Sequence, residues 1–219
     1  MQSPLFYWLV DGVDAAYGNL RFMVWNTFLA LIPFALSLWL FRGRGAHVRR
    51  LPWWLGFLTF VAFLPNAPYV LTDIIHLVKD IRGGQSIWAI SVILVPQYFL
   101  FMLIGFEAYV ASLVSLARYL SREGKQAWIP FAELTLHGLT AIGIYLGRFL
   151  RFNSWDILTR PDTLVIETVE RLLHKQPLAI IAATFCIIAV LYWVMKQLTL
   201  ALVLYWRTRR LRTAQRYLM

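Results

Sequence analysis

Long apolar runs dominate this chain and predict its secondary structure. We assign five membrane spans to them, at residues of about 22–41, 51–69, 87–120, 128–150 and 178–206. The first run, Phe22 to Phe41, has twenty residues with Asn26 as its most polar member, and twenty helical residues cover about 30 Å of hydrocarbon. The pattern therefore predicts an all-α integral membrane protein with five transmembrane helices in one domain, 1–219, and a basic cytoplasmic tail at 207–219.

The third run is longer than a bilayer requires. Its 34 residues would form a helix of about 51 Å, or two short spans that turn near Gly105. A sixth span would export the arginine-rich tail, so we expect one long helix, kinked at Pro96.

Composition supports the membrane class and narrows the partners. The chain is 60% hydrophobic and only 15% charged, whereas soluble domains average about 25% charged residues. The net charge of +10 resides in arginines beside apolar runs, which is typical of membrane topology signals, so we expect membrane lipid and no nucleic acid as a partner. Cys186 is the only cysteine, which excludes an intrachain disulfide.

The distribution of charge predicts an orientation. The connections at 42–50 and 118–127 and the tail are strongly basic, whereas the other connections balance basic residues with acids. The positive-inside rule then places the N-terminus outside and the C-terminus in the cytoplasm of a bacterial plasma (inner) membrane.

The second run is interrupted within "LPNAPYVLTDIIH" (64–76). Pro65 and Pro68 favour extended conformations at Leu64 and Ala67, so we expect the second span to be broken at its outer end. Irregular backbone at membrane depth is tolerated where it is buried in protein or lines a wet cavity. The stretch is therefore either a proline turn into the next helix or the floor of an outward-facing site.

Two segments on the predicted outer side, 70–80 and 161–175, combine apolar and charged residues with helical periodicity. We expect both to be interfacial helices on the outer leaflet.

Two polar clusters on this side are candidates for a site. The first cluster consists of Asn66, Tyr69, Asp73 and His76. The second lies in "GRFLRFNSWD" (147–156) and consists of Arg148, Arg151, Asn153, Ser154 and Asp156. Arg148 and Arg151 share a helix face and could bind an anion, although arginines near helix ends also commonly extend to lipid headgroups.

The same stretches resemble a known family. "MVWNTFLALIP" (23–33), "FLPNAPYVLTDIIHL" (63–77) and "GIYLGRFLRFNSWD" (143–156) resemble a bacterial membrane family catalogued as domain of unknown function 1361. The resemblance implies no established activity. It adds Asn26 to the candidate site and carries the family pattern onto both clusters: Asn26, Asn66, Pro68, Tyr69, Asp73, His76, Arg148, Asn153, Ser154, Trp155 and Asp156.

Asp73, His76 and Asp156 are the candidate catalytic residues, as acid/base groups. The same three are the candidate ligands if a divalent metal binds, but their pattern is weaker than that of established metal motifs. Ser154 could be a nucleophile, yet no nucleophile-elbow pattern surrounds it.

A third group, Glu107, His137 and Lys196, lies deep in three different spans. Intramembrane ionisable residues usually pair, so we expect Glu107 to pair with Lys196 in this polar layer. A structural clamp is favoured over a proton path.

Three function classes remain open, and the sequence does not decide whether the protein is an enzyme. The leading class is a membrane-embedded enzyme or binder whose outward-facing polar site takes an anionic ligand, of the phosphorylated lipid or glycan type. The alternatives are a small oligomeric transporter and a non-catalytic assembly or scaffold subunit, which would require a homo-oligomer or a membrane-protein partner.

Overall fold

The computed structural model describes residues 4–43, 50–152, 159, 162 and 175–216, and the regular elements in these residues are helices. In chain order they are α1 (Pro4–Leu40), α2 (Leu51–Phe63), α3 (Asn66–Tyr69), the 3₁₀ turn η2 (Val70–Asp73), α4 (Ile74–Arg82), α5 (Ile87–Ala89), the π turn η3 (Ile90–Leu94), α6 (Val95–Arg122), η4 (Gln126–Trp128), α7 (Ile129–Phe149) and α10 (Lys175–Arg216).

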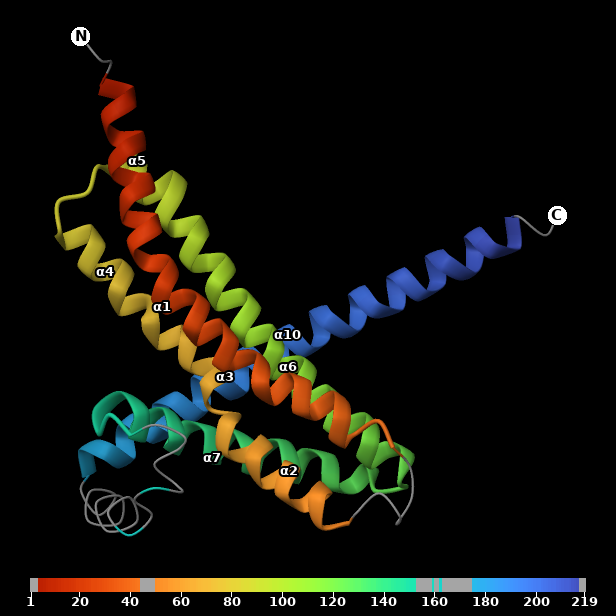
Figure 1. The fold of residues 1–219 in the computed structure, drawn as a ribbon. Helices are drawn as coiled ribbons and strands as arrows, with labels where there is room; N and C mark the ends of the chain where they lie inside the picture. Colours follow the sequence, from red (N-terminus) through yellow and green to blue (C-terminus); the bar gives the residue numbers. More distant parts are fainter. Residues whose placement is uncertain (1–3, 44–49, 153–158, 160–161, 163–174, 217–219) are drawn as a thin grey trace.

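The five predicted spans are confirmed. Five helical stretches are long and apolar enough to cross a membrane: Gly12–Leu40, Leu51–Arg82, Ile87–Arg122, Gln126–Phe149 and Lys175–Arg210. In Figure 1, α1 and α6 run side by side with α4 along their flank, α2 lies beside α7, and α10 crosses the bundle so that its C-terminal half projects away from it.

Two helices extend beyond their predicted ends. The first begins at Pro4 rather than near residue 22, and the last continues through Trp206 to Arg216. Hydropathy locates only the part of a helix that lies in hydrocarbon. Helical hydrogen bonding can continue beyond the apolar run until a residue that ends the helix is reached, so a helix can be longer than its apolar run.

The third span is one continuous stretch, as predicted. The chain widens into the π turn η3 immediately before Pro96. Proline has no N–H and its ring crowds the carbonyl one turn earlier, so a wide turn at this point lets the helix continue.

The second span keeps helical backbone angles through its interruption, so the predicted extended backbone is wrong. Leu64 has φ −54° and ψ −38°, and Pro65 has φ −59° and ψ −26°, both in the right-handed helical region. Both prolines fall within the first turn of the new helical segment, where their missing N–H groups would have no partner anyway. The span is interrupted at residues 64–65, and the chain changes direction there (Figure 1).

Close contacts hold α3 between α6 and α7. A Cβ on Gly105 of α6 would lie 2.6 Å from the Val70 side chain, and one on Gly143 of α7 would lie 2.5 Å from Pro65. Only a residue without a side chain allows these approaches, so the two glycines fix the position of the interrupted segment.

The helix α4 turns its polar face onto α1. Asn19 donates a hydrogen bond to Asp80 at 2.8 Å, and one turn along α1 the Phe22 ring stacks on His76. Four apolar residues of α4 are exposed instead, Ile74, Ile75, Val78 and Ile81, whereas Leu77 packs into the core. An exposed apolar surface beside the half-buried polar side chains of His76 and Asp80 suits contact with lipid. Whether α4 is interfacial stays a prediction, and most of the second predicted interfacial helix, 161–175, lies outside the described residues.

The connections at the other end of the bundle lie together. The Arg122 guanidinium of α6 donates to the carbonyl oxygens of Phe41 and Arg42, where α1 ends. This contact brings basic residues of the first and third connections to one end of the molecule.

Candidate functional site

Asp73 is the centre of the outer polar cluster. It ends the η2 turn, is 2% exposed, and accepts a hydrogen bond of 2.7 Å from the Asn26 amide of α1. Its other carboxylate oxygen lies 3.7 Å from the Arg148 guanidinium of α7. The carboxylate therefore joins three spans that are far apart in the sequence.

Arg148 holds α7 against the interrupted span. Its guanidinium donates to the Thr72 carbonyl at 3.0 Å and lies 5.9 Å from the centroid of the Tyr69 ring. Because one hydrogen bond, the ion pair with Asp73 and the ring contact hold the same side chain, Arg148 has a fixed position at the edge of the site.

Asn66 and His76 have different surroundings. The Asn66 amide donates to the Phe63 carbonyl at 3.0 Å, which satisfies a backbone group at the interruption of the helix. The His76 ring stacks on Phe22, with ring centroids 4.7 Å apart.

A cavity of about 410 Å³ lies beside these groups, between α1, α3 and α7. Trp25 and Leu29 form part of its apolar wall. Its lining includes every predicted site residue of the outer clusters that the structure describes: Asn26, Asn66, Tyr69, Asp73, His76, Arg148 and Arg151. The remaining members, Asn153, Ser154, Trp155 and Asp156, lie outside the described residues.

Arg151 has an unusual backbone for its residue type. Its φ is 58°, in the left-handed region, just beyond the end of α7, where glycine is the common residue. A non-glycine residue there costs about 1 kcal/mol. The side chain lines the cavity, so an arginine occupies a strained position at the rim of the site.

The charges described around the cavity favour an anion. Arg148 and Arg151 contribute two positive charges and Asp73 one negative charge, with a formal sum of +1 when His76 is neutral. Both oxygens of Asp73 face donors, which suits a cation poorly, and the described residues contain no group of three metal-binding side chains. The metal set with Asp156 stays a prediction.

The comparison with known families identifies the family of the chain. A model described as "Protein of unknown function (DUF1361)" matches residues 25–190. This chain belongs to the DUF1361 family. The matched range includes both outer clusters. No curated protein and no solved structure matches the chain.

The deep polar layer of this DUF1361 chain differs from the prediction. Lys196 pairs with Glu133 of α7 at 2.6 Å, and Tyr192 donates to the same carboxylate oxygen at 2.6 Å. Glu107 instead accepts a hydrogen bond of 2.8 Å from Thr199. The predicted Glu107–Lys196 pair is therefore wrong.

His137 belongs to the same region but bonds elsewhere. Its Nδ1 lies 2.7 Å from the Tyr109 hydroxyl of α6, and its ring centroid lies 4.7 Å from that of Tyr192. Together the Glu133 and His137 contacts connect α6, α7 and α10, which agrees with the structural clamp that we favoured.

Helical spacing in the sequence indicates Glu133 and Tyr192, the two members of this layer that the sequence analysis missed. Glu133 and His137 are four apart on α7, and Tyr192 and Lys196 are four apart on α10. Residues with this spacing share a helix face, so the two spans each present a pair of polar groups to the other.

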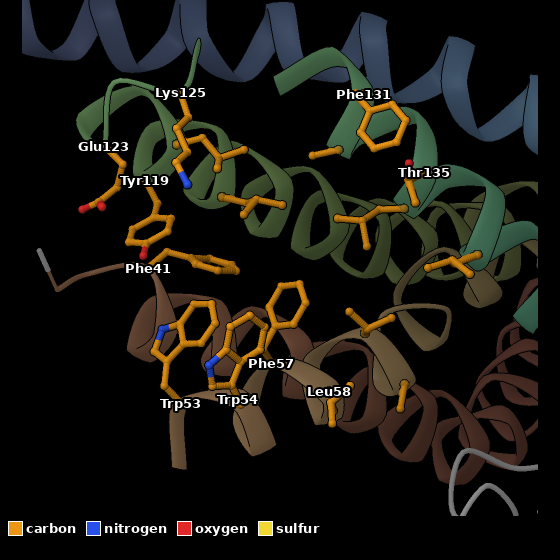
Figure 2. Close-up of a pocket in the computed structure, with 17 residues that line it drawn as sticks. Phe41, Trp53, Trp54, Phe57, Leu58, Tyr119, Glu123, Lys125, Phe131 and Thr135 are labelled. Carbon is orange, nitrogen blue, oxygen red and sulfur yellow. The ribbon is translucent and has the colours of Figure 1, made fainter. Parts of the chain in front are cut away.

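Two further cavities lie towards the opposite end of the bundle. One of about 500 Å³ is basic, with Arg42, Arg118 and Arg122 in its lining. The other, of about 620 Å³, is apolar and lies between α2, α6 and α7 (Figure 2).

Proposed function

We propose that the outer cavity of this DUF1361 protein binds the anionic group of a phosphorylated ligand, of the lipid or glycan type, at the membrane. The observation that carries the proposal is Arg151, a strained arginine at the cavity rim beside Arg148. Asp73 and His76 line the same cavity and are the acid/base groups that a reaction there would use.

The environment of Arg148 and Arg151 suits a phosphate. Arginine offers several donors in a planar arrangement that matches phosphate oxygens, and a partly enclosed site strengthens the attraction. Arg148 is already held by Thr72 and Asp73, so little ordering is needed when the ligand binds.

The two alternative classes have less support. A scaffold subunit needs the two clusters to meet, but it does not need a cavity of about 410 Å³ between them. The transporter hypothesis relied on a polar layer through Glu107 and Lys196, yet Glu107 lies on a separate cavity between α6 and α10.

We also infer that the site faces outward from a bacterial inner membrane, with the C-terminus in the cytoplasm. The support is the basic end of the bundle, where Arg122 contacts the end of α1. A reporter fused after Met219 should be active only in its cytoplasmic form. Activity only in the exported form would reverse this orientation.

The binding proposal is tested with a short-chain alkyl phosphate and the alcohol of equal chain length. In detergent, the wild-type protein should bind the phosphate and discriminate against the alcohol, as measured by native mass spectrometry. Arg151→Gln should weaken phosphate binding about tenfold, which corresponds to about 1.4 kcal/mol.

Arg82→Gln is the matched control, because Arg82 is an exposed arginine of α4 that is not part of the cavity lining. Its affinity for the phosphate should equal that of the wild type. If the Arg151→Gln variant bound the alkyl phosphate as tightly as the wild type does, the proposal would be contradicted.

A further inference from the structure

The apolar cavity between α2, α6 and α7 has walls that the described residues leave uncovered. Aromatic side chains of α2, among them Trp54 and Phe57, lie opposite Phe131 and Thr135 of α7 (Figure 2). Leu58 is 64% exposed and Phe131 is 63% exposed. In a bilayer such apolar walls suit contact with hydrocarbon chains.

This apolar cavity and the outer cavity follow the same two helix faces. Ala62 of α2 lines both of them. On α7, Leu139 lines the apolar cavity, and Gly143, four residues further on, lines the outer one. Residues four apart lie one above the other on a helix, so the two cavities follow one another along the α2–α7 groove.

The length of the groove is informative. Phe131 lines its apolar end and Arg148 its polar end. These positions are seventeen residues apart on α7, which corresponds to a rise of about 26 Å. The hydrocarbon of a bilayer is about 30 Å thick, so one leaflet accounts for about 15 Å. A chain that fills the groove is longer than one leaflet.

We propose that the ligand is a long-chain lipid phosphate whose phosphate lies at Arg148 and Arg151 and whose hydrocarbon chain follows the groove into the apolar cavity. This inference rests on the function proposed above and names the class of ligand. The basic groups at one end and the apolar walls at the other match the two parts of such a molecule. Past Ala62 the chain would lie over the contact between Pro65 and Gly143.

A second lipid source competes for the same walls. Figure 2 shows the Lys125 side chain pointing into the apolar cavity from the turn after α6. A lipid of the opposite leaflet could place its phosphate on Lys125 and its chain between α2 and α7. The experiment must therefore distinguish a lipid whose phosphate lies at Arg148 and Arg151 from one whose phosphate lies at Lys125.

The experiment measures the affinity of the purified full-length protein, in nanodiscs, for alkyl phosphates of increasing chain length. The series runs from chains shorter than one leaflet to chains longer than the groove. For the wild type, affinity should keep rising as the alkyl chain becomes longer than one leaflet, and it should level off when the chain is about as long as the groove. The longest chains should bind about tenfold more tightly than the shortest, which corresponds to about 1.4 kcal/mol.

Thr135→Trp narrows the apolar cavity at an exposed position, and Leu134→Trp is its matched control. Leu134 is the neighbouring exposed residue of α7 and does not line the cavity. Thr135→Trp should abolish the gain from longer chains and leave the shortest phosphate unaffected. Leu134→Trp should change neither.

The remaining outcomes overturn the inference in distinct ways. If wild-type affinity levels off at the shortest chains, the chain does not enter the groove, while the headgroup site stands. If Lys125→Gln rather than Arg151→Gln abolishes binding, the lipid enters from the other leaflet. If Thr135→Trp changes only the oligomeric state, the groove is a protein interface. If Arg151→Gln leaves the shortest phosphate unaffected, the proposed function itself fails.

Discussion

Two ion pairs in this protein are built from similar side chains but have different surroundings. At the outer site, Asp73 and Arg148 lie 3.7 Å apart beside a cavity of about 410 Å³. In the deep layer, Glu133 and Lys196 lie 2.6 Å apart, with the Tyr192 hydroxyl on the same carboxylate oxygen and its ring 5.2 Å from the lysine nitrogen.

The two ion pairs differ in whether they leave charge available to bind a ligand. The deep carboxylate is tightly bonded by two donors, and the pair connects α7 to α10. The outer pair is looser, and a further arginine, Arg151, lies on the same cavity. The first arrangement stabilises helix packing, whereas the second leaves positive charge available to a ligand.

The largest effect is expected from breaking the deep pair. Lys196→Met should destabilise the protein by about 3 kcal/mol, the low end for a buried pair because both side chains keep some exposure. Adding Glu133→Gln should recover part of that loss, since no unpaired carboxylate then remains. Thermal and denaturant unfolding in detergent would measure both variants.

Glu107→Gln provides the control for this cycle. Glu107 bonds to Thr199 and not to Lys196, so its effect should add to that of Lys196→Met within about 0.5 kcal/mol. If the stability losses of Lys196→Met and Glu133→Gln were additive, and those of Lys196→Met and Glu107→Gln were strongly coupled, Glu107 rather than Glu133 would be the partner of Lys196.

A smaller effect on stability is expected at the outer pair, with an opposite effect on binding. Asp73→Asn keeps the shape of the side chain but weakens its contacts with Asn26 and Arg148, at a cost of about 2 kcal/mol. It also removes the negative charge that competes with a ligand for Arg148. Affinity for a short-chain alkyl phosphate should therefore rise severalfold while the unfolding temperature falls. A simultaneous loss of affinity would mean that Asp73 is needed to position the arginine.

The smallest change in stability is expected from Arg151→Gly. Glycine adopts the left-handed conformation without strain, so stability should stay equal or increase by at most about 1 kcal/mol. Phosphate affinity should nevertheless fall about as far as in Arg151→Gln. Unchanged affinity in a folded Arg151→Gly variant would show that the arginine serves another purpose.

The membrane architecture follows directly from the sequence because each span is an apolar run, and run length is a local property. The approach of Asp73 to Arg148 was also predictable, since opposite charges lay on the same expected side. The partner of Lys196 was missed, although the spacing of Glu133 and His137 on α7 held a signal for it. The prediction matched Lys196 with Glu107 by depth in the membrane, and depth alone ignores which face of a helix a side chain occupies.

Proline conformation shows another limit of local reasoning. The preference of residues before proline for extended backbone is a local tendency, and at Leu64 it was overridden. Gly105 and Gly143 hold the segment in place from α6 and α7, which are distant in the sequence. Tertiary packing of this kind cannot be read from the sequence around Pro65.

The most direct test of the central claim is the position of a bound alkyl phosphate, determined by electron cryo-microscopy of the protein in nanodiscs. Phosphate density should lie within hydrogen-bond distance of Arg148 and Arg151, between α1, α3 and α7. Phosphate density confined to the basic cavity beside Arg42, Arg118 and Arg122 would contradict the account.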